Sequence, residues 1–156
     1  MKFVFMTIGI PGSGKSTWAN EFAQLNPEFK IVSSDKIREE FYGDESIQGN
    51  PKDVFKIAFK RTAKILQHDN ARVIFDATNI QRKYREQFID YMKKGVEDAE
   101  NLYFTAVFFD CPYQKAIERQ NERSRKVPNN VIYKMYSKLE PPTKEEGWDW
   151  ILRKGE

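Results

Sequence analysis

The stretch Gly9–Ser16 reads GIPGSGKS and matches the pattern G-x-x-x-x-G-K-[ST] at every fixed position. It follows a nearly continuous apolar run, Phe3–Ile8, and precedes a segment with apolar residues at helical spacing, Lys15–Leu25. A strand, a loop and a helix in this order form the context in which the motif binds nucleotide phosphates. Glycines let backbone N–H groups turn toward the phosphates, and the helix N-terminus adds partial positive charge. The stretch therefore predicts a triphosphate-binding loop.

The residue types in this loop predict separate roles. Lys15 is expected to neutralise oxygens of the β- and γ-phosphates during catalysis, and the Ser16 hydroxyl is expected to ligate Mg²⁺. The residues predicted to bind the nucleotide here are Gly9, Pro11, Gly12, Ser13, Gly14, Lys15, Ser16 and Thr17.

Strand-like and helix-like segments alternate along the rest of the chain. Further strands are expected at 29–32, 72–75, 102–109 and within 147–152, and helices at about 35–42, 50–66, 81–94, 113–123 and 128–139. This alternation predicts an α/β protein with three layers, a P-loop kinase fold with a central parallel sheet of four to five strands and a helical lid. The 156 residues show no repeat or composition shift, so a single domain, 1–156, is expected.

Composition excludes several classes of protein. A net charge of +3 permits a nucleic-acid partner without requiring one. The single cysteine, Cys111, rules out an internal disulfide and fits a reducing compartment. The longest apolar run near the N-terminus, Phe3–Ile10, is too short to span a bilayer. We therefore expect a cytoplasmic protein without a membrane partner.

Three aspartates follow the ends of predicted strands, at the edge where parallel α/β sheets bind ligands. Asp35 begins a helix with Arg38 three residues later, so the two side chains can share one face and hold a hydroxyl and an adjacent phosphate. A simple helix N-cap is an equally good interpretation of Asp35. The apolar run before Asp76 is Walker-B-like and predicts a position near Mg²⁺. Asp110 follows a similar run, so the pattern alone does not decide which aspartate serves the metal.

A basic segment follows the last of these strands: Arg119, Arg123, Arg125 and Lys126. Arg119 and Arg123 are four residues apart and share one helical face. An arginine that closes over the γ-phosphate assists phosphoryl transfer, and in a chain that has a phosphate loop we favour this lid interpretation over a solvated charge run.

Another basic face, formed by Lys56, Lys60, Arg61 and Lys64, could touch a polyanion. The solvated side of an amphipathic helix is the favoured interpretation.

Taken in order, these motifs resemble the 5′-hydroxyl polynucleotide kinases. The resemblance runs through Ile8–Ala19, Ser34–Arg38, Asp76–Asn79, Arg119–Arg123 and Val127–Pro128, which together span nearly the whole chain. One departure is that Ala77 stands between Asp76 and Thr78, whereas the best-known member of that family has the two residues adjacent.

The resemblance also implies roles for individual residues. Asp35 would be the general base for the 5′-hydroxyl, Arg38 would hold the acceptor phosphate, and Arg123 would be the lid arginine. The acceptor site would further include Asp76, Thr78, Asn79 and Val127, and Arg119 would join the nucleotide site.

The leading hypothesis is an ATP- and Mg²⁺-dependent kinase of DNA or RNA 5′-hydroxyl ends that acts in nucleic-acid repair, with a ligase downstream. Two alternatives use the same scaffold: a kinase of small molecules, nucleosides or tRNA-linked hydroxyls, and a binding module that uses nucleotide hydrolysis only as a switch.

Overall fold

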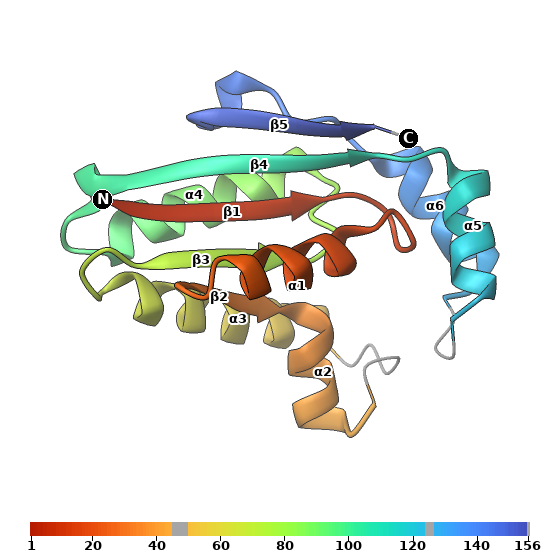
Figure 1. Ribbon diagram of the computed structural model, residues 1–156, viewed down its shortest axis with the longest axis horizontal. Helices are drawn as coiled ribbons and strands as arrows, with labels where there is room; N and C mark the ends of the chain where they lie inside the picture. Colours follow the sequence, from red (N-terminus) through yellow and green to blue (C-terminus); the bar gives the residue numbers. More distant parts are fainter. Residues whose placement is uncertain (45–49, 124–126, 156) are drawn as a thin grey trace.

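The protein is built on one five-stranded parallel sheet with the strand order β2-β3-β1-β4-β5 (Figure 1). The computed structural model describes residues 1–44, 50–123 and 127–155. The strands are β1 (Lys2–Ile8), β2 (Phe29–Ser33), β3 (Arg72–Asp76), β4 (Leu102–Asp110) and β5 (Trp150–Gly155). The expected three-layer α/β fold with a parallel sheet of four to five strands is confirmed.

Helices cover both faces of this sheet. They are α1 (Lys15–Leu25), α2 (Ser34–Tyr42), α3 (Pro51–Leu66), α4 (Arg82–Gly95), α5 (Tyr113–Asn121) and α6 (Asn129–Lys138), with short 3₁₀ turns η1 (Ala99–Asn101) and η2 (Lys144–Glu146). No helix within the described ranges is long and apolar enough to cross a membrane.

Two elements, α5 and β5, differ from the sequence prediction by two residues or more. Helix α5 ends at Asn121 instead of Arg123, because the N–H groups of Glu122 and Arg123 bond to carbonyls three residues back and tighten the last turn. Strand β5 occupies residues 150–155 instead of 147–152, because Gly147 takes a left-handed φ of 113° and ends η2 at that point.

The sheet buries different residues on its two faces. On one face, Val4, Met6 and Ile8 of β1 belong to the main core with α3 and α4. On the other face, Phe5 packs against Trp18 and Phe22 of α1 at ring-centroid distances of 6.3 and 5.5 Å. Since β1 is buried on both faces, its sequence is almost continuously apolar.

The strand order brings the predicted functional segments to one edge. The connection from β1 leads to β2 on one side of β1, whereas the connection from β3 leads to β4 on its other side, and ligands bind in α/β sheets at such a switch point. The register pairs Ser33 at the end of β2 with Asp76 at the end of β3. The loop after β1, the start of α2 and Asp76 therefore meet at the carboxyl edge of the sheet.

A buried ion pair between Arg85 and Glu146 stabilises the turn that follows β3 at this edge. Arg85 of α4 and Glu146 of η2 are fully buried and form two hydrogen bonds of 2.7 and 2.8 Å. Arg85 also donates to the carbonyl of Asn79 (2.9 Å), and the Trp148 indole donates to Glu146 (3.0 Å). The pair thereby connects the C-terminal segment to the turn that follows β3.

Candidate functional site

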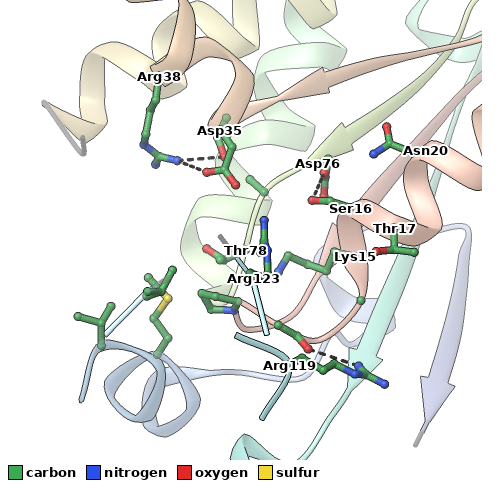
Figure 2. A pocket seen from close by; sticks show the side chains of 18 of the residues that line it. Lys15, Ser16, Thr17, Asn20, Asp35, Arg38, Asp76, Thr78, Arg119 and Arg123 are labelled. Carbon is green, nitrogen blue, oxygen red and sulfur yellow. Dashed lines mark hydrogen bonds and ion pairs between the residues drawn. The ribbon is translucent and has the colours of Figure 1, made fainter. Parts of the chain in front are cut away.

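A cavity of about 910 Å³ lies at the carboxyl edge of the sheet and gathers most of the predicted site residues (Figure 2). Those that line it are Pro11, Gly12, Gly14, Lys15, Ser16, Thr17, Asp35, Arg38, Asp76, Thr78, Arg119, Arg123 and Val127. Segments separated by more than a hundred residues in the sequence therefore share one site.

The phosphate loop depends on glycine at two positions of left-handed backbone. Gly12 has a φ of 84° and Gly14 a φ of 99°. A Cβ atom on Gly12 would lie 2.5 Å from the carbonyl oxygen of Ala116, so the loop packs directly against α5. Gly9 and Ser13 were predicted to bind nucleotide, but they are not among the residues that line the cavity. Both face the protein interior: a Cβ atom on Gly9 would meet the Ser13 hydroxyl and Phe109, and the Gly9 N–H donates to the Thr78 carbonyl (2.9 Å).

Lys15 places a buried cation at the centre of the loop. Its ammonium donates to the carbonyl of Ile10 at 2.8 Å. Burial lowers the pKa of Lys15 to about 8, while the nearby carboxylates of Asp76 and Asp35 oppose that change and Arg123 adds to it. A bound anion would favour the charged form, so the pocket suits a polyphosphate.

Ser16 and Asp76 form the pair of oxygen groups that fits a magnesium ion. The Ser16 hydroxyl donates to Asp76 Oδ2 at 2.9 Å (Figure 2). The Thr7 hydroxyl donates to Asp76 Oδ1 at 2.8 Å. Hydroxyl and carboxylate oxygens beside a phosphate site are ligands that Mg²⁺ accepts. The described residues contain no group of three or more His, Cys, Asp or Glu that could hold a metal.

Asp110, the competing aspartate, lies elsewhere. Its carboxylate pairs with Arg153 of β5, and Asp110 is not among the residues that line the cavity. The geometry therefore places Asp76 beside Ser16, whereas Asp110, at the end of β4, pairs with β5.

One wall of the cavity is formed by α2. Asp35 and Arg38 make an ion pair of 2.9 Å, and both side chains are seen on the α2 wall of the cavity in Figure 2. The N-cap of α2 is Ser33, whose hydroxyl accepts from the N–H of Lys36, so Asp35 does not serve as the cap. Arg38 is 8% exposed, and its Nε has no hydrogen-bond partner among the described residues. An arginine held in this way can receive a further anionic group.

The basic segment reaches the loop from α5. Arg119 donates to the carbonyl of Gly12 at 3.3 Å, and Arg123 lies just after the helix with its side chain near Lys15 (Figure 2). Both line the cavity, as the lid interpretation requires. Arg125 and Lys126 lie outside the described residues.

Asn79 lies apart from the cavity. Its side-chain amide donates to the carbonyl of Thr7 (2.8 Å), its φ is 48°, and it is not among the lining residues. Asn79 braces the turn after β3, where a polar residue in left-handed backbone is common.

Sequence reasoning missed an apolar wall beside Val127. Phe55 of α3 and Val131 and Met135 of α6 line the same cavity. Val131 and Met135 are four residues apart, and this spacing on one helical face could have indicated the wall. The apolar pattern does not separate residues that line a cavity from residues of a core, since the neighbouring Ile132 is buried in a core cluster.

Comparison with known proteins identifies a family and a related protein. The family described as AAA domain matches residues 4–142. An L-seryl-tRNA(Sec) kinase of Methanococcus maripaludis is 30% identical over 146 residues, which cover 90% of this chain and 54% of that protein, so the chain spans about half the length of this curated relative.

Two solved structures share the fold. A fungal RNA kinase superposes with a TM-score of 0.72 at 17% identity, covering 97% of this chain and 73% of that one. A chain of the Pnkp1/Rnl/Hen1 RNA repair complex superposes with a TM-score of 0.71 at 22% identity, covering 88% and 44%. Since the family match takes in most of the sequence, the chain belongs to the AAA domain family, and its fold is that of a P-loop kinase.

Proposed function

We propose that this domain is an ATP-dependent kinase that transfers the γ-phosphate to the 5′-hydroxyl of a polynucleotide. The observation that carries the proposal is the Asp35–Arg38 pair, an acid and a buried arginine 2.9 Å apart in the same cavity as the phosphate loop. A terminal nucleotide offers a hydroxyl for the acid and a phosphate on its 3′ side for the arginine.

The residues can divide the reaction between them. The Asp35 carboxylate accepts the proton of the acceptor hydroxyl while the acceptor oxygen forms a bond to the γ-phosphorus. The bond from that phosphorus to the bridging oxygen breaks, and the nucleoside diphosphate leaves. Lys15 and Arg123 neutralise the charge on the transferred group. Ser16 and Asp76 would hold Mg²⁺, which when bound neutralises charge on the β- and γ-phosphates.

The apolar wall suits the rest of such an acceptor. Phe55, Val127 and Met135 line the cavity and offer apolar surface to a nucleobase. A product with a 5′-phosphate end is a substrate for ligation, so we expect a nucleic-acid ligase to act downstream.

A second candidate is phosphorylation of a hydroxyl carried by tRNA. It is favoured by the 30% identity with the L-seryl-tRNA(Sec) kinase, although the chain covers only 54% of that protein. The Asp35 carboxylate would accept the proton from that hydroxyl in the same way.

Transfer of γ-labelled phosphate from ATP tests the proposal. We expect label in 5′-hydroxyl RNA or DNA, and the comparison acceptors are seryl-tRNA, free nucleosides and small sugars. Asp35→Asn should lower the transfer rate by about 10²–10⁴-fold while nucleotide binding persists. Asp110→Asn, at a strand end outside the cavity, is the matched control and should keep its rate. Absence of label from both oligonucleotides contradicts the proposal, and transfer to seryl-tRNA alone supports the second candidate.

A further inference from the structure

Helix α3 carries a row of four lysines on its outer face: Lys52, Lys56, Lys60 and Lys64, called here the lysine row. All four are exposed. A step of four residues advances about 6 Å along a helix, so the row covers about 18 Å. The buried residues of α3 also recur every four positions, from Val54 to Leu66, and are shifted by two from the lysines. The lysine row therefore lies opposite the buried face.

The lysine row lies on a helix with a single acid, Asp53 in the first turn of α3. Within residues 1–44, 50–123 and 127–155, none of the four lysines forms a salt bridge. The nearby Glu40 of α2 pairs instead with Arg61 at 2.6 Å. Like charges at i,i+4 destabilise a helix by about 0.2–0.5 kcal/mol per pair. A merely solvated face would relieve this repulsion by alternating acids and bases.

The lysine row starts at the catalytic cavity. Phe55, in the first turns of α3, lines that cavity between Lys52 and Lys56 in the sequence. From there α3 runs beside the sheet toward the opposite edge (Figure 1). A ligand whose end occupies the cavity can thus continue along the row.

We propose that the lysine row binds the phosphodiester backbone of a single-stranded acceptor whose 5′ end lies in the cavity. This inference rests on the proposed function and narrows its acceptor to a polynucleotide several nucleotides long. The spacing of about 6 Å between lysines is close to that of successive phosphates along an extended strand. A row that is one lysine wide matches one strand rather than a duplex.

An anionic membrane fits these observations less well. Helices that bind membranes insert an apolar face, whereas the apolar face of α3 is buried in the main core. The sequence pattern alone favoured a solvated face for Lys56, Lys60, Arg61 and Lys64. The structure adds that α3 begins beside the cavity, which Phe55 lines.

The test compares acceptors of different length in a charge-removal variant. Lys56→Gln/Lys60→Gln/Lys64→Gln should raise KM about tenfold or more for a 5′-hydroxyl oligonucleotide of about 12 nucleotides at low salt, because up to three phosphate contacts are lost. KM for a nucleoside 3′-monophosphate, which does not reach the row, and kcat for both acceptors should not change. The matched control, Lys30→Gln/Lys93→Gln/Lys144→Gln, removes the same charge from exposed positions outside α3.

Direct binding separates this inference from the proposed function. Fluorescence anisotropy of a labelled oligonucleotide should show a salt dependence whose slope falls by about 2 in the α3 variant, at about 0.7 per single-strand contact, and not in the control. Equal affinity and slope in the two variants overturn the inference even if phosphate transfer occurs. If no oligonucleotide is phosphorylated, the proposed function fails. The anisotropy comparison of the two variants still shows whether the lysine row binds the oligonucleotide. Sedimentation with phosphatidylserine vesicles is the third arm, and loss of vesicle binding alone in the α3 variant also overturns the inference.

Discussion

Replacing Gly12 with alanine tests whether the phosphate loop and α5 are packed as one unit. Gly12 has a φ of 84°, and an added Cβ would lie 2.5 Å from the Ala116 carbonyl oxygen and 3.1 Å from Gln120 Cγ. The left-handed backbone costs a residue with a Cβ about 1–2 kcal/mol. Overpacking against backbone adds about 1–3 kcal/mol. We therefore expect Gly12→Ala to lower the free energy of unfolding by about 2–5 kcal/mol.

Gly43→Ala is the matched control for this experiment. Gly43 has a φ of 76°, but an added Cβ would meet no atom within 4 Å, so only the backbone cost of about 1–2 kcal/mol remains. Urea denaturation without nucleotide measures the free energy of unfolding of both variants. In thermal denaturation, each kcal/mol lost should lower Tm by about 2–4 °C for a chain of this size. Equal losses of stability in the two variants would refute the inferred packing of the loop on α5.

Three further predictions concern charged residues. Because burial holds the pKa of Lys15 at about 8, its ammonium loses a proton as the pH rises through that value. ATP affinity measured by calorimetry without divalent metal should therefore fall about tenfold between pH 7 and 9, whereas Lys15→Arg should show no such fall. Arg123→Ala should lower kcat about 100-fold or more in steady-state assays with little change in KM for ATP, and an unchanged kcat removes Arg123 from the lid role. Arg85→Met should lower the free energy of unfolding in urea by about 3–5 kcal/mol because Glu146 stays buried without its partner. Glu146→Leu in the same chain should restore part of that loss, and an additive further loss contradicts the reasoning.

The parts of the fold that could be predicted from the sequence are those specified by neighbouring residues. Helix α1 begins and ends where predicted, because the loop before it and the Asn26-Pro27 pair after it mark both ends locally. The strand end that precedes Asp35 and the one near Asp76 were found in the same way. The end of α5 was not, since the hydrogen bonds that tighten it have no counterpart in the residue pattern.

The parts that could not be predicted depend on contacts between distant segments. Arg85 and Glu146 are 61 residues apart, and in isolation each looks like an exposed charge on a short helix. The apolar wall joins Phe55 to Met135 across two helices that no local pattern connects. Asn79 was assigned to the acceptor site by resemblance, and its position was decided by the hydrogen bond to Thr7, which no spacing indicates.

Different loops and helices form the two halves of the cavity, so substitutions can change one half and leave the other intact. The half that we propose for the phosphate donor comes from the loop before α1 and from α5, while the half that we propose for the acceptor comes from α2, α3 and α6. Substitutions of the side chains that face the acceptor therefore leave the backbone that holds the phosphates untouched. A lineage built on this plan can exchange one acceptor alcohol for another in small steps and keep the same phosphate donor throughout.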